Sequence, residues 1–287
     1  MSSRAETVVM EKTAKKSHWT LWRRQVASIL RLEVGKNFTG KRSILIYLLA
    51  MTPVLIMTAL VSVHYDDIRM NFGEASVIFA NLYEGMILRT VVFFGCAWIF
   101  MNLFRGEVVD RSLHYYFLSP VKREVLVAGK YISGLFTSII LFGVMTALCI
   151  FLIYLPLGYS GAMNQIFSGP GLNQILTYMG ITVLACIGYG AVFLVIGLFF
   201  RNPIIPAILL YGWEFINFLL PPMLKKLSVV HYLHSLTPVP IPEGPFAIVT
   251  EPTSAWLTVP GLIFVTAIVL VLASFRIRRM EIKYGSE

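Results

Sequence analysis

The sequence predicts an all-α integral membrane protein. Of its 287 residues, 57% are hydrophobic and 14% are charged, and its mean hydropathy is +0.74. In soluble domains roughly half of the residues are apolar and about a quarter are charged. The apolar residues also come in long blocks, and a helix needs about 20 such residues to cross roughly 30 Å of hydrocarbon. Together, the composition and the blocks exclude an ordinary soluble domain.

Six apolar blocks are predicted to be transmembrane helices. They are residues 43–63, 85–104, 131–155, 175–200, 204–220 and 259–275. The fifth and sixth have only 17 residues each, and prolines at 203, 206, 221 and 222 flank or interrupt the fifth. The outer loops then have about 21, 19 and 38 residues, which is too short for a catalytic domain.

The distribution of basic residues predicts the orientation. With six spans, 20 of the 24 Lys and Arg residues lie on the side of the two termini and only four on the other. Basic residues concentrate on the cytoplasmic side of membrane proteins, so both termini are predicted to be cytoplasmic, in a plasma or bacterial inner membrane. A five-span alternative, with residues 204–220 re-entrant, would place Arg276, Arg278 and Arg279 outside and conflicts with this distribution.

The predicted organisation has three parts: a cytoplasmic tail at 1–42, a six-span domain at 43–275 and a basic cytoplasmic tail at 276–287. The first 42 residues contain no short apolar core, so no cleavable signal peptide is expected. The net charge of +9 is spread around the apolar blocks rather than over one face. Membrane lipids are therefore expected partners, and nucleic acid is not.

The N-terminal tail contains a predicted amphipathic helix at 18–37. Its tryptophans lie on an apolar face and most of its basic residues on the opposite face, which is typical of a helix lying in the membrane interface. The residues expected to make interfacial contacts are Trp19, Trp22, Arg23, Arg24 and Arg31. A solvated helix, or a helix packed in the bundle, is the alternative.

Motifs for cofactor binding are incomplete. Residues 35–42 fit the phosphate loop except at Arg42, which replaces the Ser or Thr that would hold magnesium. Each of the three cysteines lies in an apolar block without metal-ligand spacing. The chain itself is therefore expected to bind no metal or cofactor.

Polar residues around the fifth block are candidates for a transport pathway. Glu214 lies inside the block, where an ionisable group is costly and often functional. Asn217 follows on the same face, and Phe218 adds to an aromatic lining. A structural hydrogen bond is the alternative role for Glu214. The next segment, 221–258, is too apolar for a solvated loop and predicts short helices that are re-entrant or interfacial.

Between the second and third blocks, residues 105–130 combine charged helix ends with an aromatic patch and a Ser-Pro turn. Aromatic residues surrounded by charge favour a docking surface for a partner protein. The residues assigned to this segment are Glu107, Asp110, Arg111, Phe117, Leu118, Pro120, Arg123 and Lys130.

This stretch resembles the type 2 ABC transporter permease family. That family has an acidic residue after the second span, then Leu or Phe, Pro, a basic residue and a Lys at the third span. The corresponding positions here are Glu107, Phe117 or Leu118, Pro120, Arg123 and Lys130. The interfacial helix, the six spans and the outer segment also fit the family, so the resemblance covers almost the whole chain.

The resemblance implies a permease subunit of an ATP-driven exporter. Two permeases, identical or homologous, would form the translocation pathway, and each would dock residues 107–130 into a separate ATP-binding subunit. ATP and Mg would bind to that partner, and the permease would have no catalytic residue. The substrate stays open among lipids, polysaccharides, drugs, peptides and ions, with the aromatic lining favouring a lipid-like one.

Two alternatives belong to other classes. One is a six-span intramembrane enzyme that uses Glu214, Ser160 or His231, although the spacing provides no nucleophile and base on adjacent spans. The other is a membrane anchor of a larger complex that does not transport, since an anchor could carry the same docking segment.

Overall fold

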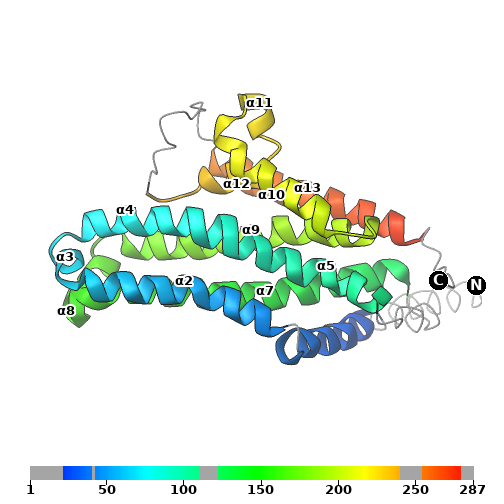
Figure 1. Ribbon diagram of the computed structural model, residues 1–287, viewed down its shortest axis with the longest axis horizontal. Helices are drawn as coiled ribbons and strands as arrows, with labels where there is room; N and C mark the ends of the chain where they lie inside the picture. The colour runs from blue at the N-terminus through cyan, green and yellow to red at the C-terminus, as the bar shows by residue number, and fades with distance from the viewer. Residues whose placement is uncertain (1–21, 41–42, 110–121, 240–253, 279–287) are drawn as a thin grey trace, which may run out of the picture.

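A computed structural model describes residues 22–40, 43–109, 122–239 and 254–278. Within these ranges every regular element is helical. Among the described residues, five helical stretches are long and apolar enough to cross a membrane: Ser43–Val63, Phe72–Glu107, Arg123–Phe167, Gly171–Phe199 and Ala255–Arg278. Their helices lie along the long axis of the molecule in Figure 1. The predicted all-helical class is confirmed, and the fold is consistent with a membrane protein.

Helix α9 (Gly171–Phe199) lies at the centre of the bundle and packs against α5 (Phe93–Val109), α7 (Arg123–Tyr154) and α13 (Ala255–Arg278). Gly197 allows the backbone of α9 to lie close to the backbone of α5. A Cβ atom on Gly197 would lie 2.9 Å from both Cα and the carbonyl oxygen of Met101. Small residues let the backbones of membrane helices pack in this way.

The segment predicted as the first outer loop, residues 64–84, is largely helical in the structure. The segment forms α3 (Tyr65–Met70) and α4 (Phe72–Leu82), and α4 continues through the π-helix η1 (Tyr83–Val92) into α5. Phe79 explains the helix: it is buried and packs edge-on against Tyr178 of α9, with ring centroids 5.2 Å apart. The second outer loop is likewise largely helical, with η2 (Leu155–Leu157) and α8 (Gly158–Phe167).

The predicted first span matches α2 (Ser43–Val63) at both ends, whereas the fifth is shorter than a full span. It forms α10 (Ile204–Phe215) and η3 (Ile216–Leu219), followed by the short α11 (Pro222–Lys225) and α12 (Val229–His234). These four elements group on one flank of the bundle in Figure 1. Short helices are thus present in the described part of segment 221–258, and residues 240–253 lie outside the described residues.

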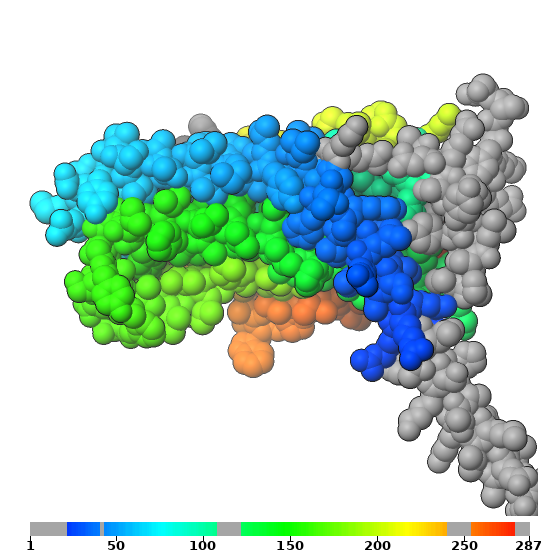
Figure 2. Space-filling model, turned by 90° about the horizontal axis from the view of Figure 1, so that it is seen from below, coloured from blue at the N-terminus to red at the C-terminus, as the bar shows by residue number. Residues whose placement is uncertain are grey.

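Residues 22–39 form the predicted N-terminal helix, which runs across the long axis of the bundle in Figure 2. Its three candidate arginines, Arg23, Arg24 and Arg31, are exposed, and Trp19 lies outside the described residues. The helix also packs on α7: a Cβ atom on Gly129 would lie 3.2 Å from Ile29 Cδ1. It therefore has one face in the bundle and one face open.

Candidate functional site

Lys130 is the centre of a buried ionic junction at one end of the bundle. We define the junction as Lys130 with Glu33 and Glu107, and we call this end of the molecule the basic end. The Lys130 ammonium donates to Glu33 Oε1 at 2.7 Å and to the Leu103 carbonyl at 2.8 Å, and it lies 2.7 Å from Glu107 Oε1. Lys130 is fully buried, and both carboxylates are about 95% buried. The junction joins three elements: the helix at 22–39, the end of α5 and the start of α7.

Glu33 was not among the residues predicted from the sequence. It is the only acidic residue in the predicted amphipathic helix at 18–37. A single acidic residue in an otherwise basic helix was the sequence feature that could have indicated a buried ion pair. Lys36, one turn later, is half-exposed and lies 4.0 Å from Glu33 Oε1 and 3.7 Å from Glu107 Oε1. Glu107 and Lys130 were predicted separately, and the structure places them in direct contact.

Arg123 connects the start of α7 to the end of α13. Its Nη1 donates to the carbonyls of Ile277 at 3.1 Å and Arg278 at 2.9 Å. These carbonyls lie in the last described turn of α13. Arg278 also pairs with Glu124, beside Arg123. The second flank of the predicted docking segment is therefore bound to the last long helix.

The middle of that segment lies outside the described residues. Asp110, Arg111, Phe117, Leu118 and Pro120 all fall within 110–121. Docking to a partner therefore stays a prediction, supported by the structure of its two flanks only.

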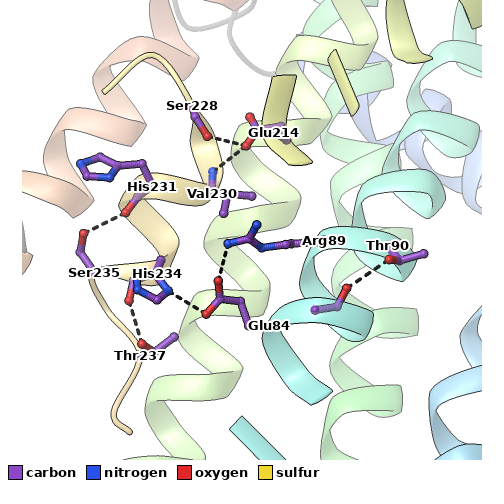
Figure 3. Close-up of polar contacts among 11 residues, drawn as sticks. Glu84, Arg89, Thr90, Glu214, Ser228, Val230, His231, His234, Ser235 and Thr237 are labelled. Atoms are coloured by element: carbon purple, nitrogen blue, oxygen red, sulfur yellow. Dashed lines mark hydrogen bonds and ion pairs between the residues drawn. The ribbon is translucent and has the colours of Figure 1, made fainter. Parts of the chain in front are cut away.

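A second polar cluster lies deeper along the bundle, on η1 and α12 (Figure 3). Glu84 is buried, accepts a hydrogen bond from Arg89 Nη2 at 2.5 Å and lies 2.7 Å from His234 Nδ1. Residues five apart are hydrogen-bonded neighbours in a π-helix, and such segments often occur at functional sites. The π-helix therefore brings Arg89 over Glu84, and His234 connects the pair to α12.

Glu214 binds the opposite end of α12. Its carboxylate accepts hydrogen bonds from Ser228 Oγ at 2.5 Å and from the backbone N–H groups of Val229 and Val230, both at 3.0 Å. Figure 3 shows this carboxylate at the first residues of α12 and Glu84 at the last. These bonds satisfy free N–H groups of the helix, which is a structural use of Glu214.

The other pathway candidates are in the same region. Asn217 is buried and its Nδ2 donates to the Lys225 carbonyl at 3.4 Å, while Phe218 is half-buried. A pathway role for Glu214, Asn217 and Phe218 stays a prediction.

The groups considered for enzyme chemistry lie in different environments. Ser160 is exposed on α8, whereas His231 is buried on α12. Within the described ranges, no three His, Cys, Asp or Glu residues are placed to hold a metal ion. Cys96, Cys149 and Cys186 are buried free thiols.

Comparison of the chain with models of known protein families finds no match, and comparison with curated proteins finds none either. In the part of the chain that the structure describes, the fold and the two polar clusters define a class: a helical protein with five candidate membrane spans and buried ion pairs between its helices.

Proposed function

We propose that the chain is a permease subunit of an ATP-driven ABC exporter. In this proposal residues 204–219 form a short sixth span, both termini are cytoplasmic in a plasma or bacterial inner membrane, and two permeases enclose the pathway. ATP and Mg bind to two partner subunits. The observation that carries the proposal is the ionic junction, because it fixes both flanks of the proposed docking segment to the membrane helices.

The contacts at the basic end are suited to transmit movement. Glu107 lies in the last described turn of α5, and Lys130 lies two turns into α7, so the junction binds the two flanks to each other. Arg123 binds the same region to α13. A force applied at residues 107–130 would therefore move α5, α7, α13 and the helix at 22–39 together, as in a rigid-body switch.

The second polar cluster supports a pathway on the face between η1 and α10. A hollow of about 280 Å³ opens there, lined by Asn81, Glu84, Gly85, Arg89, Thr90, Tyr211 and Phe215. Ionisable groups within membrane spans usually face water or protein because exposure to lipid costs about 2.5–3.5 kcal/mol on insertion scales. An open face that carries Arg89 is therefore suited to a second permease and an aqueous pathway between the two.

The test is to express the chain with its chromosomal neighbours, purify it in nanodiscs and measure the copurifying ATPase activity. Glu107→Ala and Arg123→Ala are expected to release or uncouple the ATPase. Glu74→Ala is the matched control, because Glu74 is exposed on α4, far along the same helical stretch from Glu107.

No copurifying ATPase, or both variants behaving like the unmodified chain, would overturn the proposal. An ATPase that copurifies but drives no transport would favour the anchor. Chemical activity of the single purified chain would favour the enzyme.

A further inference from the structure

The hollow between η1 and α10 is lined by a charged side chain that is partly open. Its volume is about 280 Å³, and Arg89, whose side chain is 20% exposed, forms part of its wall. Ligand sites typically have volumes of about 300–1,000 Å³, whereas one water molecule occupies about 30 Å³ of liquid. The hollow is therefore much larger than a water site and close in size to a ligand site.

The Arg89 guanidinium is the charged group best placed to meet a ligand in this hollow. Its Nη2 donates to Glu84 Oε1, and a guanidinium has five N–H donors and no acceptor. The carboxylates of this region are engaged: Glu84 also lies 2.7 Å from His234 Nδ1, and Glu214 accepts three hydrogen bonds at the start of α12. Arg89 can therefore donate further hydrogen bonds to a ligand, and the ligand must supply acceptors.

An apolar stripe on α10 leads away from the hollow. Tyr211 and Phe215 line the hollow, and Ile208 and Ile204 lie one and two turns before Tyr211. Residues three or four apart share one face of a helix. Ile204, Ile208 and Phe215 are 60%, 59% and 57% exposed. The stripe can therefore be covered by an apolar chain whose polar end lies in the hollow.

We propose that this hollow binds an amphiphile with an anionic headgroup, with the headgroup at Arg89 and the apolar chain along the stripe on α10. A phosphate or a carboxylate can accept two hydrogen bonds from one guanidinium, and such charge-assisted bonds are about twice as strong as neutral ones. The inference rests on the proposed function in one respect: in a permease subunit, such an amphiphile is the substrate class, because the hollow lies on the face assigned to the pathway.

Binding is tested on the purified full chain in a maltoside detergent, which carries no phosphate. The probe is a phosphatidic acid with a diazirine in one acyl chain, and the crosslinked residues are mapped by mass spectrometry. Crosslinks are expected within residues 204–215. Unlabelled phosphatidic acid should compete about tenfold or more better than diacylglycerol with the same acyl chains, because only the phosphatidic acid has a charged acceptor.

Arg89→Gln should reduce crosslinking of residues 204–215 by about tenfold. Arg69→Gln, the same change on an exposed residue of α3, should leave it unchanged. Because Arg89→Gln also leaves Glu84 without its guanidinium, the double variant Glu84→Gln/Arg89→Gln removes both charges and carries the test if the single variant does not fold. The competition on the unmodified chain decides the proposal in either case.

Equal competition by the two lipids, crosslinks that fall outside residues 204–215, or crosslinking that is unchanged in the Arg89 variants overturns the proposal. Full competition by inorganic phosphate, at the concentration at which phosphatidic acid competes, overturns the amphiphile in favour of a free anion.

The binding test requires no partner ATPase. Absence of a copurifying ATPase would overturn the permease proposal and leave amphiphile binding standing. Loss of the preference for phosphatidic acid would overturn amphiphile binding and leave the permease proposal standing.

Discussion

Lys130 shows how one residue sets the energetics of the basic end. Its fully buried ammonium is surrounded by Glu33, Glu107 and the Leu103 carbonyl. Removing one member of a buried ionic group leaves an uncompensated charge, which typically costs about 3–5 kcal/mol. Exposed ion pairs contribute about 0–1 kcal/mol. Lys36, which is half-exposed and faces the same carboxylates, is therefore the natural comparison.

We predict that Lys130→Met destabilises the protein by about 3–5 kcal/mol and that Lys36→Met costs about 1 kcal/mol or less. Thermal unfolding in detergent can be followed with a thiol-reactive dye, because Cys96, Cys149 and Cys186 are buried until the protein unfolds. Similar melting temperatures for the two variants would show that the junction does not stabilise the fold.

At the scale of elements, α12 shows how a helix of six residues is stabilised. A helix this short does not form alone, because nucleation is costly and too few hydrogen bonds follow. Here Glu214 accepts three hydrogen bonds at its start, and Glu84 contacts His234 at its end. The helix therefore depends on carboxylates from α10 and η1.

Glu214→Ala is expected to increase amide hydrogen exchange in residues 229–235 by about tenfold or more, because hydrogen bonds to a charged group contribute about 1.5–3 kcal/mol. Exchange measured by mass spectrometry should rise at α12 while α2 keeps its protection. Glu74→Ala serves as the control and should change neither. Unchanged protection of residues 229–235 in Glu214→Ala would show that α12 is held by its other contacts.

At the scale of the molecule, hydropathy along the chain predicted long helices such as α2. The polar sites could not be predicted from local sequence. The residues of α2 are mostly apolar and none is charged, and the predicted and observed bounds agree. α4 was missed because only Ala75, Phe79 and Ala80 of its residues are buried, so its pattern does not resemble a span. Glu33 pairs with Lys130 across 97 residues and Glu84 with His234 across 150, distances over which no local pattern operates. The pairings could therefore not be predicted.

The number of crossings is a property of the whole chain and can be measured by labelling. In a variant with the native cysteines replaced, a single Asp67→Cys should react with a membrane-impermeant maleimide added to intact cells. Arg201→Cys and Arg278→Cys should react only after permeabilisation, because six crossings place both on the cytoplasmic side. Labelling of Arg278→Cys from outside, with Arg201→Cys protected, would establish five crossings and a re-entrant segment at 204–219.

The contact between Glu33 and Lys130 also has a consequence for biosynthesis. Glu33 is made 97 residues before its partner, so the ribosome must complete the first two long helices before the ion pair can form. Chains emerge N-terminus first at about 5–20 residues per second. The N-terminal helix therefore spends about 5–20 s of translation without its anchor, and the arrival of Lys130 completes the basic end.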